Sequence, residues 1–544
     1  MLFYRPWPGT LAGTLPKDVA DPALNLWALR WIEHTLFTNP TEIFDTNIYW
    51  PELGTLTYSE PVLPLGIAFA VIRFVVRDPV IAYNLLTIAL GGLAFTGGYL
   101  LAHRLTGRRD AAVLAAIAVT FNGYVFSHQS QIQLLTTGLL AIVTLLFLRV
   151  LERPTILGGV GLGVAIATTA TSSLYYGAVL AIALAGMGLA ALVLRRVSRR
   201  TVAALASAGL VAAIFVAPVA LRYDSVHDAE LFDRPVEPGL ALDTEDFVTP
   251  QFDSLLYDGL SDRLLEANFA AEHAPNEHIY FAGFVTLLLA GVGGVALITR
   301  RYAGRELAIV LAGGAATALV AYGVKAGGIT MPYHYLREWG VPGFDGIRAP
   351  VRFASFTVLA LAALAAFGFA AIARRAPRRA PVIAGILAVV LVLELWAPYP
   401  RANFSVDDRN EQLHRTLARE AQGAVLELPI PDPRIKALGW PFVEAPRMVM
   451  STYDWRPRIN GYSGFWPRGY LERAAAFNEF PSPRSLALLE VLQVTHVVLR
   501  VGPSLAGYPQ LTAAGAQKIV DELPACADAR RFERDWLVEL CATG

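Results

Sequence analysis

Residues 17–64 read KDVADPALNLWALRWIEHTLFTNPTEIFDTNIYWPELGTLTYSEPVLP, and this stretch decides how the rest of the chain is interpreted. It is too polar to span a bilayer and too rich in aromatic residues to be a plain tail. Apolar residues recur at helical spacing between Leu24 and Leu36, and Trp27 and Trp31 are of the kind that lies at headgroup depth. We therefore expect a helix here that lies in the membrane interface.

Acidic residues flank this expected helix without a matching run of Lys or Arg: Asp18, Asp21, Asp45 and Glu60. Two interpretations of Asp21 stay open. It can cap the helix that starts at Pro22, because Asp accepts backbone N–H bonds at such a position. It can also act as a general base that takes a proton from an acceptor hydroxyl at the membrane face.

The composition is that of a polytopic membrane protein, with 544 residues, 55% hydrophobic, 17% charged and a mean hydropathy of +0.45. The net charge of zero gives no sign of nucleic-acid binding, and we expect no such partner. Arginine greatly outnumbers lysine, which is typical of a GC-rich bacterial genome. Cys526 and Cys541 lie close to the end of the chain, where a disulfide and two free thiols are equally open.

Charge distribution sets the expected topology. Ten apolar runs are long enough to cross a membrane: 80–102, 110–127, 131–150, 156–172, 174–194, 201–221, 280–299, 307–324, 353–373 and 381–398. The run at 62–76 is shorter and contains Arg73. If it is interfacial, every basic cluster between spans lies on the cytoplasmic side, as the positive-inside rule requires. If it spans, all of them lie outside, so we predict that it does not span.

The predicted organisation is mainly α-helical, in a bacterial inner membrane. An outer-face loop region with interfacial helices occupies 1–79, and about ten transmembrane helices occupy 80–398, with outer loops at 222–279 and 325–352. Short strand patterns at 424–430, 495–501 and 536–540 alternate with helical patterns at 407–421, 469–477 and 484–492. We expect them to form an extracytoplasmic α/β domain at 399–544 with its own core.

Several polar residues lie near predicted span ends. For His128 we slightly favour a role in helix capping over one in ligand binding. The loop 222–279 is dense in Asp, Glu and His but matches no metal signature, so no metal ligand is predicted there, and Glu277 and His278 are its better candidates for substrate binding. Arg348 and Arg352, four residues apart, suit a lipid phosphate, although headgroup anchoring explains them equally well.

Five segments resemble a bacterial group within the GT-C class of integral membrane glycosyltransferases. The matching segments are DPALNLWALRWIEH (21–34), FDTNIYWP (44–51), LTYSEP (56–61), PGFDGIRAPVRF (342–353) and NGYSGF (460–465). NGYSGF lies in a Gly-, aromatic- and Arg-rich loop at 456–470, RPRINGYSGFWPRGY. This loop suits stacking on a sugar or packing against the membrane part, and packing is the interpretation we favour.

The resemblance implies transfer of a sugar from a polyprenyl-phosphate donor to a lipid or glycan acceptor at the outer face, with inversion. Asp21 matches the catalytic Asp of the class, with Asp45 or Glu60 orienting the acceptor. It also implies that Arg348 with Arg352 stabilises the phosphate that leaves. His128, Tyr58, Glu277 and His278 are further candidates for substrate binding. No cofactor is expected, and a divalent cation is left open. The alternative function is a non-catalytic scaffold or carrier in cell-envelope polysaccharide assembly.

Overall fold

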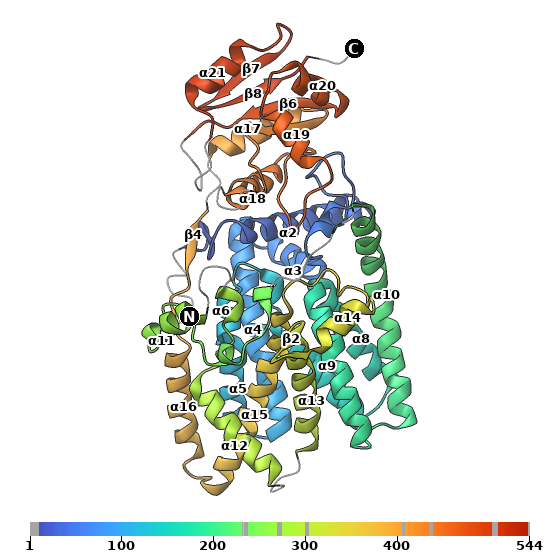
Figure 1. Cartoon of the computed structure of the whole chain (residues 1–544), viewed down its shortest axis with the longest axis vertical. Coiled ribbons are helices and arrows are strands. Elements are labelled where there is room, and N and C mark those ends of the chain that lie inside the picture. Colours follow the sequence, from blue (N-terminus) through green and yellow to red (C-terminus); the bar gives the residue numbers. More distant parts are fainter. Residues whose placement is uncertain are drawn as a thin grey trace. The chain divides into compact units, whose positions relative to one another are not determined.

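The chain folds as two compact units (Figure 1). The computed structural model describes residues 10–230, 232, 238–268, 275–299, 304–404, 408–434, 439–502 and 510–541. Unit 1 contains residues 85–221 and 233–399, and unit 2 contains residues 9–84, 222–232 and 400–544. The predicted boundaries at residues 79 and 398 lie near two of these unit boundaries, but the segments before and after them belong together in unit 2.

Each of the ten apolar runs carries a helix. These are α4 (Pro79–Thr106), α5 (Arg109–Phe121) with α6 (Gly123–Ser127), α7 (Thr137–Glu152), α8 (Ile156–Ser172), α9 (Leu174–Val193), α10 (Arg199–Glu230), α12 (Phe284–Ile298), α13 (Arg305–Ala321), α15 (Ala354–Arg375) and α16 (Ala380–Glu394). Among the described residues, five stretches are long and apolar enough to cross a membrane: Pro79–Thr106, Arg109–Ser127, Leu174–Val193, Arg199–Glu230 and Pro350–Arg375. The predicted mainly helical membrane fold is confirmed, whereas the number of spans stays a prediction.

Helix α15 is the centre of unit 1 and packs against α5, α12 and α13. Its sequence is rich in Ala and contains Gly368, which allows neighbouring backbones to approach closely. A Cβ atom on Gly368 would lie 1.9 Å from the carbonyl oxygen of Leu289, and one on Gly293 would lie 2.3 Å from that of Leu364. Small residues on both helices therefore set the α12–α15 contact.

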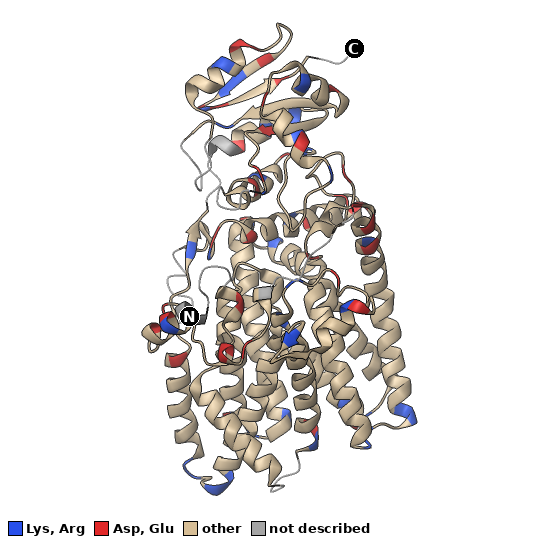
Figure 2. Cartoon of the chain, in the orientation of Figure 1, with Lys and Arg blue, Asp and Glu red and all other residues tan. Residues whose placement is uncertain are grey.

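Basic residues gather at one end of the unit 1 helices. Arg104 at the end of α4 binds Glu152 at the end of α7 at 2.9 Å and Glu306 at the start of α13 at 2.8 Å. Figure 2 shows Lys and Arg at the corresponding ends of α10 and α16. The clusters predicted to share the cytoplasmic side thus lie at the same end, except Arg300 and Arg301, which lie outside the described residues. That this end is cytoplasmic stays a prediction.

In unit 2, helix α2 (Asp21–Thr38) packs against α3 (Leu63–Arg73) and α18 (Trp440–Ser451). Trp27 is 2% exposed and donates from Nε1 to Asn47 Oδ1 at 3.0 Å, and Trp31 is 8% exposed and donates to the Ile43 carbonyl. The expected helix is present and protein buries both tryptophans, whereas its position in the membrane interface stays a prediction. Their aromatic spacing is typical of an interfacial helix, yet here protein covers the same face.

The C-terminal part of unit 2 contains a four-stranded sheet, in the order β5 (Ala424–Leu428), β6 (Val494–Leu499), β8 (Asp535–Glu539) and β7 (Asp528–Phe532). Strands β5 and β6 are parallel and the other pairs antiparallel. Helix α17 (Asp408–Glu420) covers one face, where Leu413 and Leu417 pack on Val498 and Leu537. The predicted α/β region is confirmed, and sequence analysis missed β7, α18 and a helix at Ala513–Asp521.

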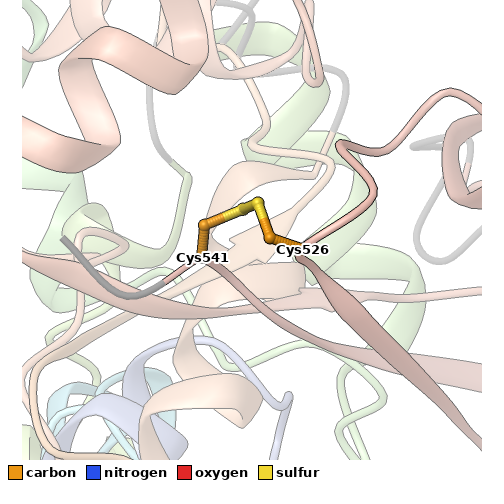
Figure 3. The surroundings of a disulfide bond; sticks show 2 residues. All are labelled: Cys526 and Cys541. Atoms are coloured by element: carbon orange, nitrogen blue, oxygen red, sulfur yellow. A yellow bond between two sulfur atoms is a disulfide. The ribbon is translucent and has the colours of Figure 1, made fainter. Parts of the chain in front are cut away.

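A disulfide joins Cys526 and Cys541 beside the β7–β8 hairpin, with 5.2 Å between their Cα atoms (Figure 3). Of the two alternatives left open, the structure has the disulfide. The remaining elements are β1 (Thr14–Pro16) paired with β4 (Arg401–Asn403), β2 (Lys325–Ala326) paired with β3 (Ile329–Thr330), α11 (Asp258–Asn268), α14 (Pro332–Glu338), α19 (Tyr470–Phe477), α20 (Pro483–Val491) and α21 (Ala513–Asp521).

Candidate functional site

Asp21 is the first residue of α2, and its carboxylate contacts a segment far away in the sequence. Oδ1 accepts a hydrogen bond from the Tyr462 hydroxyl at 2.8 Å. The N-cap position belongs to Ala20, which makes no side-chain capping bond, and Asp18 accepts from the Ala20 N–H at 2.8 Å. Asp21 is therefore not the N-cap residue, although its charge suits the positive end of the helix dipole.

Four of the five segments that resemble GT-C proteins contact one another in unit 2. The Tyr49 N–H donates to the Asn460 carbonyl at 3.1 Å, and the Gly464 N–H donates to the Tyr58 carbonyl at 3.1 Å. Segments 44–51 and 56–61 thus both bind NGYSGF through backbone hydrogen bonds. The bond from Tyr462 to Asp21 adds segment 21–34 to the same assembly.

Trp440 of α18 packs against the ring of Tyr462. The two rings meet edge to face with centroids 5.0 Å apart, and Trp440 Nε1 donates to the Gly461 carbonyl at 3.2 Å. A tyrosine fixed in this way presents its hydroxyl in one direction. The loop therefore packs within unit 2 and orients a donor toward Asp21, whereas its predicted packing against the membrane part stays a prediction.

Asp45 has structural partners of its own. Its Oδ1 accepts from the Gly54 N–H at 2.7 Å and from Arg222 Nη2 at 2.7 Å. Gly54 has a φ of +74°, and a Cβ there would lie 2.6 Å from Val226 Cγ2, so glycine is required at this turn. Asp45 thus fastens the turn at Gly54 to the end of α10.

Tyr58 and Glu60 lie on the same turn, close to the end of α10 and Phe232. Tyr58 is 1% exposed, and its hydroxyl has no hydrogen-bond partner within the described part of the chain. Its ring meets Phe232 edge to face at 4.8 Å. Glu60 is half-buried near Tyr223, whose hydroxyl donates to the Ser59 carbonyl at 2.6 Å. The structure thus places Tyr58 in a buried contact, and its predicted role in substrate binding stays a prediction.

In unit 1, Glu277, Arg352 and His128 form a buried cluster. Arg352 donates from Nε to Glu277 Oε2 at 2.9 Å and from Nη2 to Oε1, so the pair is bidentate. His128 Nε2 lies 3.0 Å from Oε2 of the same carboxylate, and Nδ1 lies 2.9 Å from the Tyr124 carbonyl. Burial alone raises the pKa of Glu277, but the charges of Arg352 and His128 hold that pKa well below its usual range.

The two arginines predicted to bind phosphate have different surroundings. Arg352 lies in the 3₁₀ turn Pro350–Phe353 with its guanidinium 4.9 Å from the Tyr175 ring centre, whereas Arg348 precedes this turn and is half-buried. They therefore do not share a helical face. The Tyr175 hydroxyl accepts from the backbone N–H of Arg348 at 3.2 Å, which fixes the chain there. A phosphate would have to compete with Glu277 for Arg352.

His278 pairs with Asp246, and both are buried. Nδ1 of His278 lies 3.1 Å from Asp246 Oδ2, and Nε2 lies 2.6 Å from the Gly239 carbonyl. Burial lowers the pKa of His278, but the bond to Asp246 and its charge together raise that pKa. Asp243 lies close enough to make a three-residue cluster that could hold a metal ion. Both ring nitrogens already face oxygen acceptors, however, so the imidazole is engaged in holding the loop.

Sequence reasoning missed Tyr462, Tyr175 and Arg222 as partners of the candidate residues. Tyr462 was visible only as part of a Gly- and aromatic-rich loop, and Tyr175 lies inside an apolar run. Arg222 follows the last apolar residue of its run and carries no local signal. Each finds its partner across more than 150 residues of sequence, so only the fold brings them together.

No family model matches the chain, and no curated protein matches it by sequence. Its structure is similar to that of the arabinofuranosyltransferase AftD from Mycobacteria, with a TM-score of 0.61 and 14% identity, covering 97% of this chain and 38% of that one. A second AftD structure, of the mutant R1389S, has a TM-score of 0.57 and 15% identity, covering 98% and 40%. This chain has the GT-C fold. The GT-C fold expected from the five segments is thus confirmed, although the chain spans well under half the length of AftD.

Proposed function

We propose that the protein is a membrane glycosyltransferase that moves a sugar from a polyprenyl-phosphate donor to a lipid or glycan acceptor at the outer face. The observation that carries the proposal is the assembly of four segments in unit 2, which ends in the hydrogen bond from Tyr462 to Asp21. A carboxylate within reach of an acceptor hydroxyl can serve as its general base. The similarity of the fold to that of an arabinofuranosyltransferase supports the same class of reaction.

In the proposed reaction, Asp21 accepts the proton of the acceptor hydroxyl as its oxygen attacks the anomeric carbon. The bond between that carbon and the phosphate oxygen breaks, and polyprenyl phosphate leaves with the electron pair. Attack opposite to the leaving group inverts the anomeric centre. Tyr462 is the positioning residue, because its hydroxyl donates to Oδ1 and so orients the Asp21 carboxylate.

For the donor phosphate we propose Arg348 as the contact residue in unit 1, with Arg352 supporting it. Arg348 is half-buried, whereas two nitrogens of Arg352 already bind Glu277. A fixed guanidinium beside the leaving phosphate stabilises the charge that develops on it. Arg348→Lys keeps the charge but loses the planar fork, so we expect a higher KM for the donor at unchanged stability.

The test is sugar transfer by the purified protein in lipid, with a set of polyprenyl-phosphate sugars. Asp21→Asn keeps the size of the side chain and removes its proton affinity, so turnover should fall by roughly 10²–10⁴ while the melting temperature is unchanged. Asp78→Asn is the matched control. Asp78 caps α4 by accepting from the N–H groups of Val80 and Ile81, and Asn caps equally well.

Undiminished transfer by Asp21→Asn would remove Asp21 from the mechanism and make Asp45 the candidate base. Absence of transfer by the wild type with every donor would favour the scaffold or carrier function. In that case glycan binding by the intact protein becomes the measurement of choice.

A further inference from the structure

The end of the C-terminal sheet brings together three side chains that suit a metal ion. His496 on β6 lies directly opposite Glu539 on β8, so both side chains project from the same face of the sheet. Glu420 is the last residue of α17, which covers this face. One ligand atom from each of the three residues lies within 4.8 Å of the other two.

His496 is the observation that points to a ligand rather than to a cluster of acids. The residue is 2% exposed, and its Nε2 atom is buried without a hydrogen-bond partner among the described residues. Its Nδ1 atom lies 3.0 Å from the Thr495 hydroxyl. A buried ring nitrogen that lacks a partner is costly and needs a reason. Coordination of a metal ion would supply such a reason, because imidazole is the commonest metal ligand in proteins.

The charge around His496 favours a cation. Glu420, Glu539 and Asp528 bring three carboxylates to this end of the sheet, because Asp528 lies opposite Glu539 on its other side. Two cations also lie near His496: Arg456, and Arg530, which is paired with Glu420 and lies 3.5 Å from Asp528. The Arg530 side chain is 37% exposed, so it can turn into solvent at little cost when a metal ion takes its place.

The disulfide makes the geometry of the ligands rigid. Cys526 lies two residues before Asp528 and Cys541 two residues after Glu539, so the bond joins the two strands next to the acidic pair (Figure 3). With β7 and β8 fixed covalently and β6 held by the ladder, two of the three ligands need no rearrangement. Ligands that are already in place lower the ordering cost of binding.

We propose that Glu420, His496 and Glu539 bind a divalent transition-metal ion of the Zn²⁺ type. One imidazole and two carboxylates suit such an ion, whereas Mg²⁺ and Ca²⁺ prefer sites made of oxygen alone. Asp528 or water completes the tetrahedral shell. The inference concerns the C-terminal sheet and is independent of the proposed glycosyl transfer.

The experiment uses the full-length protein, stripped with EDTA and titrated with Zn²⁺ by calorimetry, with the melting temperature followed in parallel. We expect saturable binding of one ion and a higher melting temperature, with no response to Mg²⁺ at the same concentration. Substituted with Co²⁺, the site should give the visible absorption of a tetrahedral ion with nitrogen and oxygen ligands.

Glu539→Gln and His496→Asn should each weaken binding at least tenfold. Glu539 is exposed, so its variant remains informative even if His496→Asn does not fold. Glu522→Gln, which removes an exposed acid paired with Lys518 on the outside of the same domain, is the control and should bind as the wild type does. Absence of saturable binding, or equal binding by wild type and Glu539→Gln, would overturn the proposal and leave an ion-pair cluster only.

Discussion

Asp21 and Glu277 are both carboxylates at positions where the sequence suggested chemistry, but their surroundings differ. Asp21 is half-buried and receives a neutral hydroxyl donor from Tyr462. Glu277 is buried and bound by Arg352 and His128, which keep its pKa well below the usual range. A carboxylate held ionised in this way is a poor proton acceptor. The comparison shows two different surroundings for a carboxylate: charged partners hold Glu277 ionised, whereas the hydrogen bond from Tyr462 to Asp21 comes from a neutral group.

The largest effect should come from breaking the pair in unit 1. Glu277→Gln leaves the Arg352 guanidinium buried without its counter-charge, which typically costs about 3–5 kcal/mol of unfolding free energy. Denaturant titration in detergent measures the loss. Glu338→Gln, at an exposed acid in the same unit, is the control and should change stability by less than about 0.5 kcal/mol. Equal stability of the two variants would contradict the role given to Glu277.

A smaller effect is expected when the Glu277–Arg352 pair keeps both charges but loses its bidentate geometry. Arg352→Lys retains a cation beside Glu277 and removes the second parallel hydrogen bond. We expect a loss of about 1–3 kcal/mol in the same titration. The double variant Glu277→Gln with Arg352→Met should recover part of the loss, because no unpaired charge remains. Additive losses would show that the two side chains act independently.

Two further buried carboxylates sharpen the comparison through pH. Glu427 and Glu444 lie in one cluster of unit 2, yet desolvation by burial raises the pKa of Glu444 to about 7, whereas Arg500 and Arg458 overcome the same burial cost and lower that of Glu427 to about 2. Glu444 is met by Arg447 at 2.8 Å and lies near the negative charge of Glu427. Neighbouring charge, rather than burial, therefore decides which acid keeps its proton.

Between pH 4.5 and about 7 the unfolded chain has already released the proton that folded Glu444 still holds. The unfolding free energy should therefore fall as pH rises through this window. Glu444→Gln should flatten the pH dependence and be more stable than wild type at pH 8 by roughly 1–3 kcal/mol. Thermal unfolding from pH 5 to pH 8 measures the pH dependence of stability. If the stability of Glu444→Gln changed with pH as steeply as that of the wild type, other groups would cause the dependence.

The smallest effect should come from Asp21, when it loses the hydrogen bond from Tyr462. Tyr462→Phe removes only the hydroxyl that donates to Asp21, so kcat should fall by about 3–10-fold with KM and melting temperature unchanged. A purely structural role would move the melting temperature instead. Tyr453→Phe, at a half-buried tyrosine of the same unit, serves as the control for loss of a phenol hydroxyl.

The sequence predicted those features that depend on local pattern. Apolar runs located the helices, and the five segments indicated the GT-C fold and Asp21. Features that depend on contacts between distant residues were not predictable. Trp27 and Trp31 follow an interfacial pattern, but α18, more than 400 residues later, covers them. For the same reason the bond between Asp21 and Tyr462 has no local signal, and Cys526 and Cys541 paired only once a hairpin brought them together.

Unit 2 is assembled from segments near both ends of the chain, and this arrangement has a consequence for synthesis. About 315 residues separate Asn84 from Pro400, so at about 5–20 residues per second the first part of the unit waits roughly 15–60 s for the last. During that time the face of α2 that carries Trp27 has no α18 to cover it. A helix whose tryptophans suit a lipid surface can shelter there until its partner is made. Unit 2 can close around α2 only after residues 400–544 have been made.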